Sequence, residues 1–175
     1  MKWLIILIPI LFIFQGCMEK GYEKVGVKLE FQEFPSKYIY DGKNISPKIF
    51  IYGIDSKVKS IAIIMLDTDA PSGSFTHWLI WNIEAKYPNM TIPENIPKKG
   101  IINKPIKAIQ GKNDFNKIGY DGPRPPPGRR HHYHFKVYGL DTFLTIDAGA
   151  TKSELEKAMH DHIIQYGEAI ATYKV

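Results

Sequence analysis

Two segments of the sequence, residues 66–82 and 119–138, each join a Pro- and Gly-rich loop to an apolar run. Asp67 and His77 flank the first loop, and His131 follows the second. Apolar runs of this length are typical of buried strands, whereas Pro and Gly stiffen or turn the loops between them. Ionisable side chains at strand ends, beside rigid loops, are what a preformed binding site requires. The two segments therefore predict a strand-built scaffold that carries one pocket.

The rest of the chain also favours a mainly β fold. A length of 175 residues suits one domain with a substantial core, and 14 Gly and 12 Pro are scattered among short apolar runs. The uninterrupted apolar run from Ile61 to Leu66 indicates a central strand that is covered on both faces. We expect strands at residues 27–31, 48–52, 58–66, 76–83 and 130–140.

The end of the chain predicts the only strong helix. Thr151 is followed three residues later by Glu154, which is a capping-box pattern. Apolar residues then recur every three or four positions as far as Tyr173, as on one side of an amphipathic helix. We therefore expect a β-sandwich with a C-terminal α-helix packed on it.

The alternation of side chains along strands predicts which histidines face inward. His131 and Tyr133 share a face with the apolar residues that follow them, so both should point into the domain, whereas His132 and His134 should face solvent. His77 is expected to begin a buried row that continues with Leu79, Trp81 and Ile83. Two inward histidines beside Pro/Gly loops indicate a binding site. The alternative is that both are hydrogen-bonded core residues.

Two carboxylates accompany these histidines. Asp67 ends a strongly apolar strand, where a charge is unfavourable unless it is paired or hydrogen-bonded. Beside His77 and His131, Asp67 would fix their tautomers and raise their pKa values, and a charged imidazolium would attract a phosphate or carboxylate oxygen. Asp69 is expected mainly to stabilise the turn that leads into Pro71.

Several ordered motifs resemble the phosphatidylethanolamine-binding protein family, in its bacterial and archaeal Raf kinase inhibitor-like branch. The resemblance runs from about Phe31 to the C-terminus and departs from the family pattern at Thr68, which replaces a proline, and at His132, which replaces an arginine. The motifs are Asp-Thr-Asp-Ala-Pro at 67–71, Thr-His-Trp at 76–78, the proline loop at 122–128, His-His-Tyr at 131–133, and residues 41–47, 110–115 and 149–152.

The resemblance implies two antiparallel sheets with Greek-key connections and a C-terminal helical segment near the pocket. It implies a pocket formed by Asp67, His77, Tyr120 and His131, with Tyr120 donating to the ligand from the loop. The residues expected to bind ligand are Asp67, Asp69, His77, Tyr120, Gly122, Pro123, Pro125, Pro126 and His131. Relatives in the family bind phosphoryl headgroups or phosphorylated peptides, and some modulate kinases or proteases.

The N-terminal residues have the pattern of an export signal. Lys2 is followed by an apolar run from Trp3 to Phe14, which is shorter than the about 20 residues that span a bilayer. A small residue then precedes Cys17, the one cysteine, as in a lipobox whose cysteine is acylated. We expect residues 1–17 to be a signal peptide or an uncleaved anchor, 18–26 a tether, and 27–175 the family domain. Either arrangement places the domain outside the cytoplasm and attached to the membrane.

Composition argues against several other classes of function. The net charge of +5 is modest and the basic residues are dispersed, so nucleic-acid binding is not expected. The chain has no cysteine pair and no His-Glu-x-x-His pattern, so neither a metal nor a cofactor is expected, although His132 and His134 share a strand face.

We expect non-enzymatic binding of a small anionic or phosphorylated ligand. One alternative is a protein–protein interaction module that inhibits or modulates a kinase or protease, in which the loop residues Arg124, Arg129 and Arg130 would matter more than the histidines. The other is a hydrolase that uses Asp and His. For a hydrolase, Ser72 could approach His77, although no Gly-x-Ser-x-Gly motif occurs.

Overall fold

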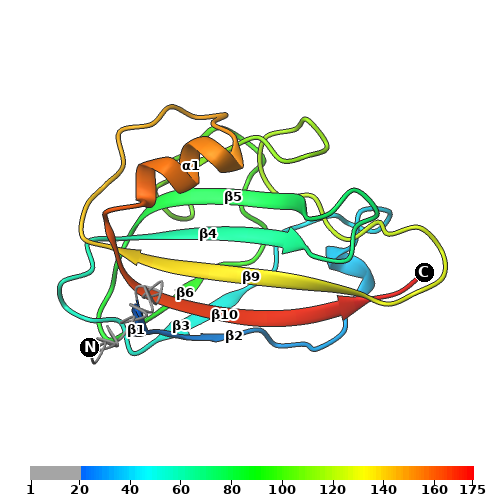
Figure 1. Cartoon of the computed structure of the whole chain (residues 1–175), viewed down its shortest axis with the longest axis horizontal. Helices are drawn as coiled ribbons and strands as arrows, with labels where there is room; N and C mark the ends of the chain where they lie inside the picture. The colour runs from blue at the N-terminus through cyan, green and yellow to red at the C-terminus, as the bar shows by residue number, and fades with distance from the viewer. Residues whose placement is uncertain (1–20) are drawn as a thin grey trace, which may run out of the picture.

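The computed structural model describes residues 21–175 (Figure 1). The expected signal segment with Cys17, and residues 18–20 of the expected tether, lie outside this range. Within it no helix is long and apolar enough to cross a membrane. The elements are β1 (Glu23–Lys24), β2 (Gly26–Lys28), a 3-10 turn at Ser36–Tyr38, β3 (Ile49–Tyr52), β4 (Ser60–Asp67), β5 (Phe75–Glu84), β6 (Asn89–Ile92), β7 (Ile101–Ile102), β8 (Ala108–Gln110), β9 (His131–Leu140), α1 (Lys152–Met159) and β10 (Ile163–Tyr173).

The strands form two sheets, so the mainly β prediction is confirmed. The larger sheet has the order β1-β10-β9-β4-β5-β8-β7, and the smaller has the order β2-β3-β6. Neighbouring strands are antiparallel except for β1 and β10, which pair in parallel at Glu23 and Lys24, within the expected tether. The Greek-key connection implied by the family resemblance stays a prediction.

Strand β4 is buried along its whole length, as its continuous apolar run predicts. It pairs with β5 on one edge and with β9 on the other, and each of its faces packs against a different layer. Ile61, Ile63 and Met65 belong to the inner core shared with the small sheet. Ile64 belongs to the outer core, which Leu155 and other residues of α1 cover (Figure 1).

The predicted long C-terminal helix is wrong beyond its first turns. The capping box forms as expected, with Thr151 accepting from the Glu154 backbone N–H, but α1 ends at Met159. The segment that follows is β10, which pairs with β9 along its length. Gly167 lies where a Cβ would come within 2.0 Å of the Val25 backbone oxygen, so this position permits the close approach of the N-terminal segment. The long pairing with β9 outweighs the helical spacing of the apolar residues.

One end of the larger sheet gathers the residues expected to form the pocket. Asp67, the last residue of β4, pairs with Phe75 at the start of β5 and with Tyr133 near the start of β9. This end lies to the right in Figure 1, where the loops between β4 and β5 and before β9 meet.

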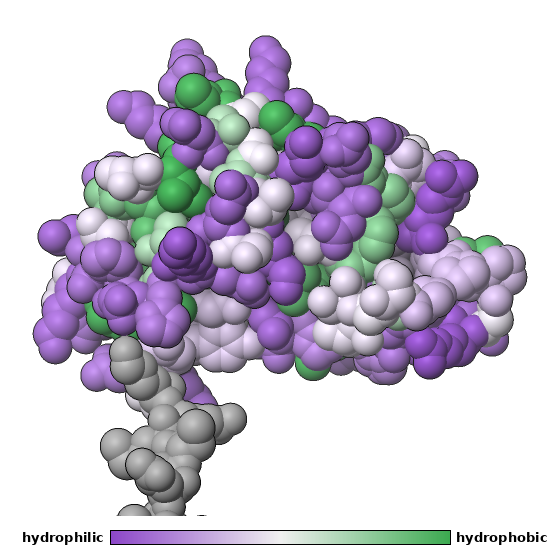
Figure 2. Space-filling model, turned by 45° about the horizontal axis from the view of Figure 1, so that its top comes forward, coloured by the Kyte–Doolittle hydropathy of each residue, from purple (hydrophilic) through white to green (hydrophobic). Residues whose placement is uncertain are grey.

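On the face that Figure 2 shows, hydrophilic residues predominate and hydrophobic residues are scattered among them.

Candidate functional site

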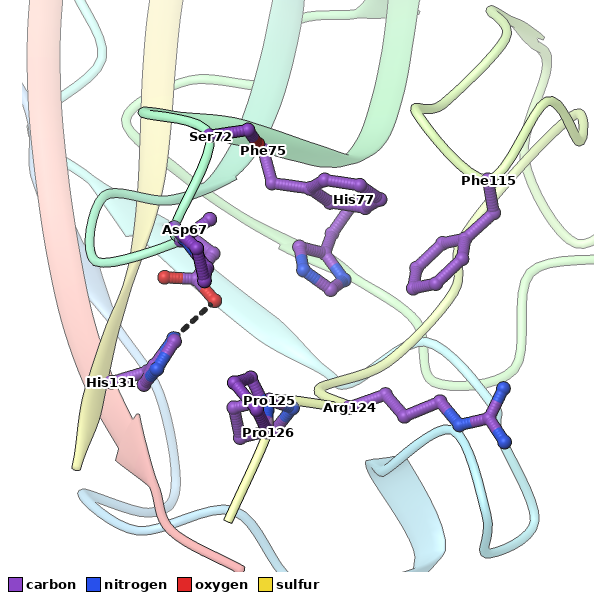
Figure 3. A pocket seen from close by; sticks show the side chains of 11 residues that line it. Asp67, Ser72, Phe75, His77, Phe115, Arg124, Pro125, Pro126 and His131 are labelled. Carbon is purple, nitrogen blue, oxygen red and sulfur yellow. Dashed lines mark hydrogen bonds and ion pairs between the residues drawn. The ribbon is translucent and has the colours of Figure 1, made fainter. Parts of the chain in front are cut away.

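The loops at this end of the sheet enclose a cavity of about 330 Å³ (Figure 3). Five of the nine residues expected to bind ligand line it. The wall is mostly apolar, with two histidines and one carboxylate from separate strands. The lining residues are Asp67, Ala70, Pro71, Ser72, Phe75, His77, Phe115, Arg124, Pro125, Pro126 and His131.

Asp67 and His131 form a buried pair in the wall of this cavity. Asp67 Oδ2 lies 2.8 Å from His131 Nδ1, and the two side chains are 5% and 2% exposed. The other oxygen of Asp67, Oδ1, accepts a hydrogen bond of 2.9 Å from the Asp69 backbone N–H. Because a carboxylate only accepts, His131 Nδ1 carries the proton in this bond. Asp67 therefore fixes the tautomer of His131, as predicted, and leaves Nε2 available for a ligand.

A β-bulge sets the direction of His77. Met65 pairs with Trp78 whereas Leu66 pairs with Thr76, so His77 is an extra residue in β5. Its ring lies against Tyr133, a residue of the inner core, with ring centroids 5.2 Å apart. Leu79 packs into the outer core instead. The prediction that His77 and Leu79 share one face of the strand is therefore wrong. Bulges commonly redirect one side chain beside a functional site, and this one directs His77 into the cavity.

The environment of His77 favours the neutral form of its imidazole. Its Nδ1 lies 2.7 Å from the backbone oxygen of Asp121, which only accepts, so Nδ1 donates. Burial lowers the pKa of His77, and this effect outweighs the bond to Asp121 and the nearby carboxylates of Asp67 and Asp121, which oppose it. Asp67 acts to raise the pKa of His77, as expected, but burial outweighs this effect and the net shift is downward.

Asp121, which sequence analysis did not select, anchors this arrangement. Its carboxylate is buried and accepts from Asn44 at 2.7 Å, Asn113 at 2.9 Å and Lys98 at 3.0 Å. Burial raises the pKa of Asp121, but the three hydrogen bonds together outweigh burial and hold the pKa below its usual value. The donors come from three separate loops, so no local sequence pattern could have indicated the cluster.

Tyr120, Gly122 and Pro123 do not line the cavity, but they join its loop to the segment around Tyr38. The Tyr120 side chain is fully buried and its hydroxyl donates to the Tyr38 backbone oxygen at 2.7 Å. A Cβ on Gly122 would lie 1.9 Å from that same oxygen. The Pro123 backbone oxygen accepts from the Tyr40 N–H at 3.0 Å. The structure thus gives these residues a supporting position, and their expected contact with a ligand stays a prediction.

Asp69 has a structural position outside the cavity lining, but its side chain pairs with His132 on β9 rather than, as expected, with the turn that leads into Pro71. Its Oδ2 accepts from the His132 backbone N–H at 2.9 Å and pairs with His132 Nδ1 at 2.8 Å. The hydrogen bonds from His132 hold the pKa of Asp69 below its usual value. Thr68, the other departure from the family pattern, donates its N–H to the His132 backbone oxygen at 3.2 Å. A proline has no N–H and could not form this bond.

Aromatic residues form a wall that the sequence did not reveal. Phe115 lies 4.8 Å from Phe75 and 5.5 Å from His77, measured between ring centroids, and Figure 3 shows the imidazole of His77 beside both phenyl rings. Tyr133 lies deeper, and its buried hydroxyl lies near the Asp67 carboxylate without a hydrogen bond of normal geometry among the described residues. Burial, followed by the nearby Asp67 carboxylate, raises the pKa of Tyr133 well above its usual value.

The arginines and outer histidines around the cavity have acidic or carbonyl partners. Arg124 lies 3.4 Å from Asp41 and remains half exposed at the mouth. Arg129 donates to the Asp69 backbone oxygen. His132 is exposed and His134 is half-buried beside Glu168, so the two do not converge. Among residues 21–175, no three His, Cys, Asp or Glu side chains are placed to hold a metal ion.

Comparison with known proteins identifies the family. The family model described as phosphatidylethanolamine-binding protein matches residues 27–174. The chain belongs to the phosphatidylethanolamine-binding protein family, in its bacterial and archaeal branch. The motifs on which the sequence resemblance rested lie within the matched residues.

Individual relatives agree with this assignment. A UPF0098 protein of Pyrococcus horikoshii is 49% identical over 176 residues, covering 97% of this chain and 87% of that protein. A UPF0098 protein of Pyrococcus abyssi is 49% identical over 179 residues, covering 99% of both. The crystal structure of Escherichia coli YbcL, described as a member of the mammalian family, has a TM-score of 0.78 and 26% identity, covering 87% of this chain and 99% of YbcL. A homologue from Chlamydia trachomatis has a TM-score of 0.75 and 30% identity.

Proposed function

We propose that this protein binds a small phosphorylated or other anionic ligand in the cavity, without converting it chemically. The observation that carries the proposal is the buried pair of Asp67 and His131, 2.8 Å apart, in an otherwise largely apolar wall. Burial of a carboxylate and an imidazole in a concave apolar site is unfavourable for folding unless they are paired, and such groups commonly mark binding sites.

The chemistry of the pair favours an anion. When His131 is protonated, Asp67 balances its charge and orients its ring, and Nε2–H is left to donate to an anionic oxygen. Such charge-assisted hydrogen bonds are about twice as strong as neutral ones. Arg124 at the mouth adds a positive charge that would attract an approaching anion.

Calorimetric titration with phosphate and phosphoethanolamine tests this proposal. We expect His131→Ala to abolish binding of both compounds while the circular dichroism spectrum stays that of the native protein. His160→Ala is the matched control, because this histidine is 75% exposed and lies outside the cavity lining. Unchanged affinity in His131→Ala would contradict the assignment of the pocket.

The same titration bears on the two alternative functions. Ser72 lines the cavity together with His77, so release of free phosphate from phosphoethanolamine would favour a hydrolase. Residues 126–130 are exposed, and Pro126 among them lines the cavity. If the unmodified protein binds neither compound, these residues make a protein–protein interaction module the better account.

We also propose that residues 1–17 direct export and that acylated Cys17 holds the domain at the outer side of the membrane. The support is the order of a basic start, a short apolar run and a small residue before the cysteine. Cys17→Ser should move the protein from the membrane fraction to the soluble fraction and abolish labelling by a radioactive fatty acid. Labelling that persists in the variant would contradict acylation at this residue.

A further inference from the structure

The hydrogen bonds of His77 determine which kind of group it can offer a ligand. Nδ1 donates to the Asp121 backbone oxygen at 2.7 Å, so in the neutral imidazole Nε2 is an unprotonated acceptor. Among the described residues no hydrogen bond of normal geometry reaches Nε2, although the Gly122 backbone lies close enough to the ring to act on its pKa, and His77 lines the cavity (Figure 3). An acceptor that faces a largely apolar cavity is best satisfied by a ligand that brings a proton.

Hydrogen bonds fix the position of Asp121, whose backbone oxygen accepts from His77. Three side chains from separate loops, Asn44, Lys98 and Asn113, donate to its buried carboxylate. The residue after it is also fixed, because the Gly122 N–H donates to Asn44 Oδ1 at 2.8 Å. The carbonyl that accepts from His77 therefore has a fixed position, and the proton of His77 is kept on Nδ1.

The charges around the cavity also favour a ligand with a single negative charge. The pair of Asp67 and His131 carries no net positive charge, and Arg124 is partly balanced by Asp41 at 3.4 Å. The ionisable groups that face or flank the His77 ring are Asp67 on β4, His131 and Tyr133 on β9, and Asp114, Asp121 and Arg124 on the loop between β8 and β9. Lys98 balances Asp121 at 3.0 Å, so these groups carry no net positive charge that would offset a second negative charge, and a doubly charged phosphoryl group would also meet the acceptor nitrogen of His77.

We propose that this pocket selects a phosphomonoester in its monoprotonated form over a phosphodiester, because His77, positioned by Asp121, presents an acceptor nitrogen to the ligand. A monoprotonated phosphomonoester supplies one P–O–H for His77 Nε2 and an anionic oxygen for His131 Nε2–H. A phosphodiester has the same charge but no acidic proton, so it leaves His77 unsatisfied. The phenyl rings of Phe75 and Phe115 suit an apolar or aromatic group on the ester. This inference rests on the anion binding proposed above.

Phenyl phosphate and methyl phenyl phosphate provide a matched pair of ligands. Both carry the same ring, and only the first can carry a proton on its phosphoryl group between pH 5 and 8. At pH 5 we expect calorimetry on the full chain to give about tenfold or more tighter binding of phenyl phosphate, because the diester leaves a buried acceptor unpaired. The ratio should fall as the pH rises above about 6, where a phosphomonoester loses its second proton. Any change in the charge of the protein affects both ligands, so the ratio isolates the proton of the ligand.

The outcomes distinguish this inference from the proposed function. If both compounds bind with equal affinity and equal pH dependence, anion binding stands, but His77 must act as a protonated donor and the selection is refuted. If neither compound binds at any pH, the proposed function fails and this inference fails with it.

A spectroscopic measurement on the unmodified protein tests the role of His77 independently of affinity. A long-range proton–nitrogen correlation spectrum shows which imidazole nitrogen carries the proton. We expect His77 to be neutral with the proton on Nδ1, both free and with phenyl phosphate bound. Protonation of Nε2 in the complex would overturn the inference. His77→Gln supplies an amide that can also donate, and it should reduce the ratio of the two affinities to about twofold or less.

Discussion

Asp67 and His131 lie 64 residues apart in the sequence, yet their side chains meet at 2.8 Å in the cavity wall. The contact follows from the register of the larger sheet, since Asp67 ends β4 and pairs with Tyr133, two residues into β9. His131 and Tyr133 point to the same side of β9, so His131 is brought over the end of β4. The strand pairing that builds the core thus also builds the site.

Replacing Asp67 should weaken both folding and binding. Asp67→Asn keeps the size of the side chain but removes the charge that pairs with His131, and we expect the free energy of unfolding to fall by about 1–3 kcal/mol. Phosphate affinity should fall as well, because His131 is no longer oriented as a charged donor. Asp69→Asn is the control, since its side chain is 28% exposed and pairs with exposed His132, where about 1 kcal/mol or less is expected. Equal losses in urea denaturation would contradict this account.

His77 should make stability depend on pH in a defined window. Its pKa is lowered by burial, so below about pH 6.5 the unfolded chain binds more protons at this residue than the folded protein. The contribution of His77 to the free energy of unfolding is therefore complete above about pH 6.5. It is lost as the pH falls toward the folded-state pKa, by at most about 1.4 kcal/mol per pH unit. Unfolding free energies of the wild type and His77→Gln, measured from pH 7 to pH 5, should diverge in slope. Parallel curves would mean that His77 is not held neutral.

The hydroxyls of Tyr120 and Tyr133 should differ in their effect on stability. Tyr120→Phe removes the donor to the Tyr38 backbone oxygen and should lower the free energy of unfolding by about 1–3 kcal/mol. Tyr133→Phe removes a buried hydroxyl that has no hydrogen bond of normal geometry among the described residues, so it should leave stability within about 0.5 kcal/mol or raise it. Thermal denaturation of the two variants provides the comparison. A larger loss for Tyr133→Phe would show that its hydroxyl has a partner in the folded protein.

Gly122 should not tolerate a side chain. In Gly122→Ala the Cβ would stand 1.9 Å from the Tyr38 backbone oxygen, so the loop or the 3-10 turn must shift, at about 1–3 kcal/mol or more. Gly21→Ala is the control, because no atom of the described residues lies within 4 Å of the position its Cβ would take. Chemical denaturation should show the loss for Gly122→Ala alone. A Gly122→Ala protein as stable as the control would contradict the close packing of this loop.

The sequence was most informative where a local pattern reflects a local cause. The uninterrupted apolar run of β4 required cover on both faces, and the capping box of Thr151 and Glu154 forms as predicted. The alternation along β9 correctly placed His131 inward and His132 outward. These features depend on a few neighbouring residues, so they could be predicted from the sequence.

Other features depend on contacts that a single sequence does not display. The segment of β10 has apolar residues at helical spacing, and only its pairing with β9 and the contact at Gly167 make it a strand. The bulge at His77 inserts one residue into the register with β4, which a regular alternation cannot predict. Asp121 acquires its role from Asn44 and Lys98, which are 77 and 23 residues away.

The most direct test of the account is a crystal structure of the protein soaked with phosphoethanolamine. We predict that the phosphoryl group lies between His77 and His131, within hydrogen-bond distance of both Nε2 atoms and beside Asp67. An empty cavity at saturating ligand, or a phosphoryl group bound elsewhere on the surface, would contradict it. In that case the two histidines would serve only the packing and hydrogen bonding of the core.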